Sequence, residues 1–226
     1  MPKSQIYIAS LGNVTAKFSI DDEKDLIQRC ISKGQFYESE ELTFLTTKLT
    51  TDEVVIDVGA NIGNHSIYLG YLSSVTQVYP VEPFRPAINI LRRNIDLNPQ
   101  SRIRNNFIGL AFSDKPNLMR SSNRQVNNIG ATRFEVDAEG DVNAICPDPL
   151  LNALDIHPTL IKIDVEGSEP AVLRGLDSTI RKLHPKLFIE VEDRNAEKVL
   201  KWIQARNYRV TWKNRRYKSN ENWFCE

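Results

Sequence analysis

The chain has 226 residues, 41% of them hydrophobic, which is enough to bury a substantial core as one domain with an N-terminal extension. Lys plus Arg and Asp plus Glu each number 29, so no net charge attracts nucleic acid or an anionic membrane. The three cysteines are widely separated and form no Cys-x-x-Cys pair, which argues against a disulfide framework or a zinc site. With no apolar run long enough to span a membrane and no signal-peptide pattern, we expect a cytoplasmic protein.

Residues 1–50 are predicted to be an appendage to the main domain, residues 51–226. Residues 6–10 and 15–20 alternate apolar and polar side chains around a Gly-Asn pair, which predicts a hairpin. A helix is expected to begin at Asp21, and a second to span residues 38–49.

A β-branched run at residues 54–58 predicts a strand that is buried on both faces. Gly59 and Gly63 follow it and lead into a helix, and Asp57 lies near the strand's carboxyl end, where open α/β sheets bind ligands. The Gly-x-Asn-x-Gly spacing differs from the Gly-x-Gly-x-x-Gly of a pyrophosphate site. This pattern favours a nucleoside-containing cofactor without a diphosphate.

A second predicted strand ends at Glu82, about one βαβ unit after Asp57. Doubly wound folds place there the carboxylate that binds ribose hydroxyls, so adenosine recognition is the simplest interpretation. The alternative is a tight strand-to-helix turn followed by a solvated strand end.

The remaining elements follow a βαβ rhythm that is interrupted once, at residues 112–158. That segment is rich in Asn, Ser, Asp and Pro and is expected to hold a short strand at 131–136 and to wall the cofactor and acceptor pocket. Helices are predicted at residues 62–71, 86–98, 169–183 and 195–206, and strands at 103–110, 159–165, 186–192, 208–212 and 222–225. The basic tip between the last two strands is interpreted as solvated surface.

Acidic side chains cluster on the fourth and fifth core strands. Lys162 and Asp164 share one side of a strand with Glu166 just beyond its end, and Glu190 and Glu192 share a face of the next strand. Carboxylates that lie close together raise one another's pKa, so one could accept a proton from a hydroxyl nucleophile. The alternative is a structural network in which Lys162 neutralises Asp164. Glu190 is favoured over Glu192 because it lies deeper in its strand.

The same acids could bind a cation. Asp164, Glu166 and Glu190 offer oxygen ligands of the kind that Mg²⁺ prefers, and a bound ion would polarise an acceptor hydroxyl. Spacing alone does not decide this, because the ligands come from separate strands. We predict a site without a metal.

Three motifs resemble those of a known family. Asp57-Val-Gly-Ala-Asn-Ile-Gly63, Val81-Glu-Pro83 and Ile161-Lys-Ile-Asp-Val-Glu-Gly-Ser-Glu169 with Leu173-Arg-Gly175 are similar to the FkbM family of S-adenosylmethionine-dependent methyltransferases, over residues 34–192. The resemblance implies an α/β, Rossmann-like class I methyltransferase fold. Its seven-stranded, mostly parallel sheet would have the order 3-2-1-4-5-7-6, flanked by helices and with strand seven antiparallel. The implied activity is O-methylation of a hydroxyl, often on a sugar of a glycan or glycosylated natural product.

The resemblance also implies roles for single residues. Those expected to bind S-adenosylmethionine are Asp57, Gly59, Asn61, Gly63, Asn64, Glu82, Pro83, Phe84, Leu110 and Ala111. Those expected near the acceptor are Glu38, His65, Asn128 and Lys162. Residues 35–38 are similar to the family's aromatic and acidic segment before strand one, which implies that the extension of residues 1–50 covers the site. Asp164 would act as the base or organise it, with Glu166 and Glu190 shaping the pocket. His65, in the first turn of a helix, is an alternative base, although a helix N-terminus disfavours its protonated form and packing explains it equally well.

Three rival functions stay open. The lysine and acids have a faint likeness to RNA ribose 2'-O-methyltransferases, although the zero net charge and the lack of a basic face weigh against a polyanion. A non-catalytic cofactor-binding module would be expected to lose the acids on strands four and five, which are present here. A nicotinamide dehydrogenase would require the pyrophosphate glycine pattern, which the chain lacks.

Overall fold

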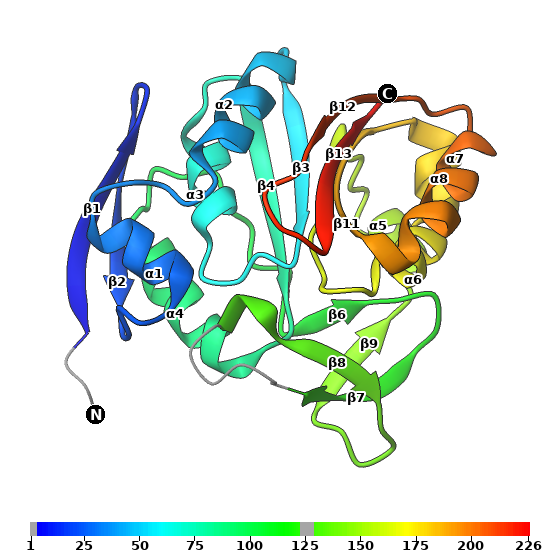
Figure 1. Cartoon of the computed structure of the whole chain (residues 1–226), viewed down its shortest axis with the longest axis horizontal. Helices are drawn as coiled ribbons and strands as arrows, with labels where there is room; N and C mark the ends of the chain where they lie inside the picture. The colour runs from blue at the N-terminus through cyan, green and yellow to red at the C-terminus, as the bar shows by residue number, and fades with distance from the viewer. Residues whose placement is uncertain (1–3, 123–128) are drawn as a thin grey trace.

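The computed structural model describes residues 4–122 and 129–226 and is built around one twisted seven-stranded sheet (Figure 1). From edge to edge the strands are β12 (Val210–Asn214), β13 (Asn220–Cys225), β11 (Lys186–Glu192), β10 (Leu160–Ile163), β3 (Glu53–Val58), β4 (Val75–Glu82) and β5 (Phe107–Ile108). Neighbouring strands from β11 to β5 are parallel, and β13 is antiparallel to both β11 and β12. The predicted class I methyltransferase order, with strand seven antiparallel, is confirmed.

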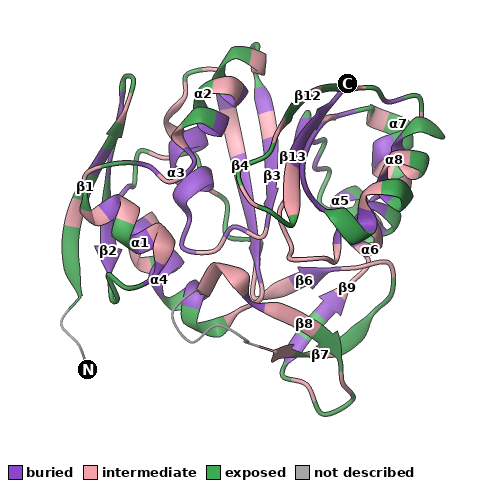
Figure 2. Cartoon of the chain, viewed as in Figure 1, coloured by how far each residue is buried: buried purple, intermediate pink, exposed green. Residues whose placement is uncertain are grey.

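Helices cover both faces of this sheet, which explains why its central strands are apolar on both sides (Figures 1 and 2). Ile56 and Val58 of β3 belong to one buried cluster and Val55 to the other. The first cluster also contains buried residues of α5 (Pro147–Ala153), α6 (Glu169–Gly175), α7 (Asp177–Leu183) and α8 (Ala196–Gln204). The second contains residues of α1 (Leu26–Ser32), α2 (Ser39–Lys48), α3 (Asn64–Tyr71) and α4 (Arg85–Asp96).

The N-terminal hairpin is confirmed as an antiparallel pair, β1 (Gln5–Leu11) and β2 (Val14–Ile20), that lies beside α1 and α4 (Figure 1). The helix predicted from Asp21 begins only at Leu26. Asp25 is extended and its carboxylate accepts the backbone N–H of Gln28, so Asp25, and not Asp21, caps the helix. The second predicted helix is confirmed as α2.

The third predicted core strand, residues 103–110, is interrupted. Ile103 makes only an isolated bridge to Val78, and β5 is two residues long. Gly109 has φ +104, in the left-handed region, and turns the chain out of the main sheet. β6 (Leu110–Phe112) therefore starts a second sheet.

This second sheet has four strands and was not expected from the sequence beyond one short strand. Its order is β6-β9-β7-β8, with β7 (Asn117–Ser122), β8 (Arg133–Val136) and β9 (Val142–Ile145), and a short helix η1 (Ile129–Ala131) precedes β8. It lies across the end of the main sheet at which β3 and β4 finish (Figure 1).

Two predicted helices differ from the structure. Residues 169–183 form two helices, α6 and α7, which meet at Leu176. Gly175, the last residue of α6, packs so closely that a Cβ on it would lie 2.2 Å from the carbonyl oxygen of Ser113. The helix predicted at 195–206 is α8, preceded by the short helix η2 (Asp193–Asn195). Among the described residues, every helix is too short or too polar to traverse a bilayer.

Candidate functional site

A cavity of about 540 Å³ opens at the carboxyl ends of β3, β4 and β10. Its walls come from the strand ends of the main sheet, the second sheet, the segment before α2, and the turn between β12 and β13, together with residues of α1, α3, α4 and α6. Open α/β sheets bind ligands at this edge, so the cavity is the candidate site.

The β3–α3 turn is held in place by close backbone packing. Gly59 has φ +85 and lines the cavity, but a Cβ on it would lie 1.7 Å from the carbonyl oxygen of Asp164. Gly63 has φ +90, and a Cβ there would lie 2.7 Å from a methyl group of Leu91. Gly63 does not line the cavity. Both glycines are therefore required by packing and backbone conformation, and at Gly63 this replaces the expected ligand contact.

Glu82, at the end of β4, is the buried carboxylate of the predicted ribose site. It is 6% exposed, so it is not a solvated strand end. One of its oxygens accepts the backbone N–H of Phe84 and the other that of Asn61, both at 2.7 Å. Burial raises the pKa of Glu82 to about 7, against the opposing effect of these two hydrogen bonds. Each carboxylate oxygen keeps a further lone pair for a ligand hydroxyl.

Asn61 supplies a second unfilled polar group. Its backbone is left-handed at φ 50, it lines the cavity, and its side-chain oxygen is buried without a hydrogen-bond partner. Pro83, Phe84 and Ala111 line the same region, beside Met119 and Phe134 of the second sheet. Together these groups fit a nucleoside. Its ribose hydroxyls would donate to Glu82, another of its donors would bond to the side-chain oxygen of Asn61, and its flat base would pack against the apolar side chains.

Besides Gly63, two further expected cofactor residues, Asp57 and Leu110, do not line the cavity. Asp57 is fully buried, 3.1 Å from Nζ of Lys162, and accepts the hydroxyl of Ser66 at 2.6 Å. Burial alone would raise its pKa, but the Lys162 ammonium and its other partners hold it below its usual range. Asp57 therefore anchors Lys162 instead of facing the ligand. Leu110 opens β6 and pairs with Asn143.

The acids predicted from strands four and five do converge. Oxygens of Asp164, Glu166 and Glu190 lie within 4.8 Å of one another, and all three residues line the cavity with Lys162. Burial and the Asp164 charge raise the pKa of Glu166 to about 8 and raise that of Glu190 as well. Lys162 also pairs with Asp164 at 3.4 Å. Burial alone would lower the pKa of Lys162, but the surrounding carboxylates raise it, so it stays charged.

Glu38 and His65 form a further buried pair on the cavity wall, with Nε2 of His65 3.4 Å from the Glu38 carboxylate. Burial and the Lys162 ammonium lower the pKa of His65 to about 4, so the ring is neutral. Burial and the Asp164 charge raise the pKa of Glu38. Asn64 also lines the cavity, where its side chain both donates to and accepts from the backbone of Tyr37. These two hydrogen bonds hold the segment before α2 against the start of α3.

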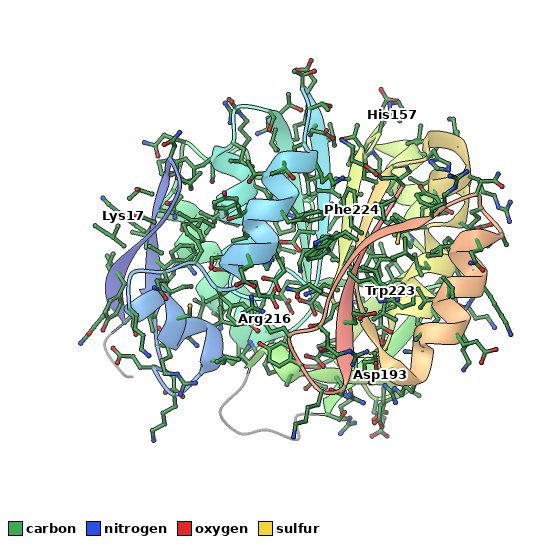
Figure 3. All side chains as sticks on the ribbon, turned by 45° about the horizontal axis from the view of Figure 1, so that its top comes forward. Lys17, His157, Asp193, Arg216, Trp223 and Phe224 are labelled. Carbon is green, nitrogen blue, oxygen red and sulfur yellow. The ribbon has the colours of Figure 1, made fainter. Side chains whose placement is uncertain are left out.

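The tip of the C-terminal hairpin was interpreted as solvated surface, yet it reaches the cavity. Tyr217, Ser219 and Asn220 line it, and the hydroxyls of Tyr37 and Tyr217 are in contact. Arg216 of this tip is labelled in Figure 3. Its guanidinium pairs at 2.7 Å with the buried Glu41 of α2, and this ion pair holds the tip against α2. An aromatic residue inside a basic hairpin tip was the sequence signal for this contact.

One expected acceptor residue cannot be placed, since Asn128 lies outside the described residues. Its neighbours Ile129 and Gly130 line the cavity. Leu26 and Ile27, at the start of α1, also line it and had no motif to mark them.

Comparison with known proteins gives a consistent family. The model of the FkbM methyltransferase domain matches residues 57–210. The hexuronic acid methyltransferase AglP of Haloferax volcanii is 25% identical over 186 residues, covering 82% of this chain and 73% of that protein. Methyltransferase 1 of Beauveria bassiana is also 25% identical, over 63% of this chain and 66% of that protein.

Solved structures show the same fold. An FkbM methyltransferase from Methylobacillus flagellatus has a TM-score of 0.53 and 22% identity; the match covers 76% of this chain and 43% of that one. This chain thus spans less than half of that structure. A tRNA m1G37 methyltransferase of M. jannaschii has a TM-score of 0.55 and 14% identity, over 99% of this chain and 57% of that chain.

Proposed function

The chain belongs to the FkbM methyltransferase family, and from this we propose that it transfers a methyl group from S-adenosylmethionine to a hydroxyl, on a sugar of a glycan or glycosylated natural product. The observation that carries the proposal is one cavity in which a nucleoside-binding pair, Asn61 and Glu82, lies beside a carboxylate cluster headed by Asp164. The first pair suits the donor, and the cluster suits a hydroxyl acceptor.

The cofactor supplies a methyl group on a positively charged sulfur. In the transfer, the sulfur–carbon bond breaks with its electron pair staying on sulfur, while a bond forms from the acceptor oxygen to that carbon. The hydroxyl proton must leave, and Asp164 is placed to accept it because it faces the cavity at the end of β10. Glu166 and Glu190 flank it and offer hydrogen-bond acceptors to further hydroxyls.

His65 is the weaker candidate for the base. Its neutral ring faces Glu38, and its Nε2 finds no well-aligned hydrogen-bond partner. Burial and the Lys162 ammonium lower its pKa to about 4, so the ring is neutral, and its Nε2 lies 3.4 Å from the Glu38 carboxylate. We assign it to positioning Glu38 on the acceptor side.

A sugar acceptor agrees with the polar character of this wall and with the hexuronic acid named for the relative AglP. RNA is the second candidate, since tRNA methyltransferases share the fold. Among the described residues, however, Lys162 is the basic side chain of the cavity wall, and it is already paired with Asp57 and Asp164. The described part of the wall therefore offers a phosphate backbone no lysine or arginine that is free of an acidic partner.

The test combines cofactor binding with an acceptor screen. Calorimetry with S-adenosylmethionine and S-adenosylhomocysteine should show one site per chain. Incubation with neutral sugars, amino sugars, uronic acids and glycosides should then give, in mass spectrometry, the mass gain of one methylene group on the acceptor. RNA binding that weakens steeply with salt, together with methylation of a ribose, would favour the second candidate. Absence of cofactor binding would reject the enzymatic proposal.

A further inference from the structure

Three carboxylates that are distant in the sequence present their oxygens to one point of the cavity. Asp164 follows β10, Glu166 lies in the turn beyond it, and Glu190 lies within β11. One oxygen from each lies within 4.8 Å of the other two. Three carboxylate oxygens that can share one centre are the ligand set that hard divalent cations such as Mg²⁺ and Mn²⁺ select.

Glu190 is the member that most requires a partner. It is 8% exposed and its side chain faces the cavity. Within residues 4–122 and 129–226, its carboxylate lies beside those of Asp164 and Glu166, and no lysine, arginine or amide side chain donates a hydrogen bond to it. Two carboxyl groups in contact inside a protein require a proton or a cation between them.

The neighbouring acid on the same strand shows the contrast. Glu192 is equally buried, but Arg133 pairs with one of its oxygens at 2.5 Å and Arg194 with the other at 2.6 Å. Lys162 lies between Asp57 and Asp164, at 3.1 and 3.4 Å. Among the described residues, Lys162 therefore compensates Asp164 in part, whereas no lysine or arginine pairs with Glu166 or Glu190.

We propose that Asp164, Glu166 and Glu190 bind one divalent cation, Mg²⁺ or Mn²⁺, on the acceptor side of the cavity. From the sequence we predict a site without a metal, since spacing alone does not show that β10 and β11 bring the three side chains together. An ion held there would offset their charge and lower the pKa of a hydroxyl bound to it. That catalytic role rests on the proposed methyl transfer, whereas binding of the ion does not.

The experiment titrates Mn²⁺ into the full chain in chelator-free buffer and follows the loss of the free-ion signal by electron paramagnetic resonance. We expect one bound ion per chain, displaced by excess Mg²⁺. Glu190→Gln and Glu166→Gln keep the side-chain shape and should each weaken binding by about tenfold or more, at least as much as loss of a supporting residue does. Thermal melting followed by circular dichroism checks that each variant is folded.

The matched control is Asp114→Asn. Asp114 also lines the cavity, but its carboxylate pairs with Arg174 at 2.8 Å, and it lies outside the cluster. Its variant should bind Mn²⁺ as the natural chain does. A dissociation constant above about 1 mM for the natural chain, at the weak limit of protein sites, would overturn the proposal. So would unchanged affinity in both glutamine variants.

Failure of the metal site and failure of the proposed function give different results. Binding of S-adenosylmethionine and methyl transfer at an unchanged rate in excess chelator would overturn a catalytic role for the ion and leave the function standing. Mn²⁺ bound through Glu190 and Glu166, with no cofactor binding, would support the metal site and reject the methyltransferase proposal.

Discussion

The two sides of the cavity differ in how the chain builds them. On the proposed cofactor side, Asn61, Glu82 and Phe84 lie close together in the sequence, and the Glu82 carboxylate accepts the backbone N–H groups of the other two. On the acceptor side, Glu38, Asp164, Glu190 and Tyr217 come from four distant segments. The first side is encoded locally, and the second exists only after the whole domain has folded.

They also differ in electrostatics. The Glu82 carboxylate accepts two backbone N–H groups, so its charge is supported before any ligand arrives. The acceptor-side carboxylates face one another and share a single ammonium with Asp57. Substitutions on the two sides should therefore separate binding of the cofactor from turnover of the acceptor.

The largest separation is expected for Asp164→Asn. The variant removes the proposed base but keeps the side-chain shape, so turnover should fall by about a thousandfold, within the range of general-base catalysis. The affinity for S-adenosylhomocysteine, measured by calorimetry, should stay within about twofold. Equal loss of turnover and of cofactor affinity would show that Asp164 is a structural member of both sides.

Gly59→Ala tests the close packing of the β3–α3 turn against the backbone of Asp164, where the two sides meet. A Cβ at this position meets the backbone carbonyl oxygen of Asp164, and the left-handed φ of +85 adds strain. We expect the free energy of unfolding in urea to fall by about 3 kcal/mol, the upper range for overpacking.

The matched control is Gly12→Ala in the hairpin turn, which has φ +57 and open space around it. This change should lower the free energy of unfolding by about 1 kcal/mol, because only the left-handed backbone conformation is unfavourable for alanine. Similar losses for the two variants would mean that contact with Asp164 does not constrain the loop.

The sequence predicts the locally encoded parts well. Apolar runs and turn glycines locate β3, α3 and β4, and the motifs lead to the strand order that the structure has. The interval after the first core strand points to Glu82, which the structure shows to be buried at the cavity; its ribose contact stays a prediction. The packing roles of Gly63 and Asp57 are missed, because local spacing does not show that Leu91 and Lys162 lie against them.

The non-locally built parts are predicted only in outline. The second sheet pairs β7 with both β8 and β9 across long connections, which short polar strands do not reveal. The break of the third strand depends on a left-handed Gly109, and the hairpin tip reaches the cavity through a pair between Arg216 and Glu41. Such long-range contacts have no period or motif in the sequence.

Arg216→Met tests whether this long-range pair holds the acceptor side together. Glu41 is fully buried, so losing its partner should cost about 2 kcal/mol of unfolding free energy. The KM for the acceptor should rise while cofactor affinity stays unchanged. The control is Lys218→Met, at an exposed residue of the same turn, which should change neither the free energy of unfolding nor the KM for the acceptor. An equal effect in this variant would show that the positive charge of the hairpin matters, and not the pair of Arg216 with Glu41.

Glu82→Gln tests the cofactor side. The amide retains one acceptor oxygen and loses the charge that strengthens hydrogen bonds to ribose hydroxyls and backbone N–H groups. We expect about tenfold weaker binding of S-adenosylhomocysteine, close to 1.5 kcal/mol, by calorimetry. Turnover at saturating cofactor should change little. A large fall in turnover with unchanged affinity would assign Glu82 to the acceptor side.

The smallest effect is the pH dependence that Glu82 gives to cofactor binding. Burial raises its pKa to about 7, above that of an exposed glutamate, so the folded protein without ligand takes up a proton as pH falls through 7. Ribose hydroxyls donate to the ionised carboxylate, and protonation therefore competes with the cofactor. From pH 8 to pH 7 the affinity should drop by about twofold, with a steeper fall below pH 7. Because Gln does not titrate, the Glu82→Gln variant should lose this dependence; a profile that persists in the variant would place the titrating group elsewhere in the cavity.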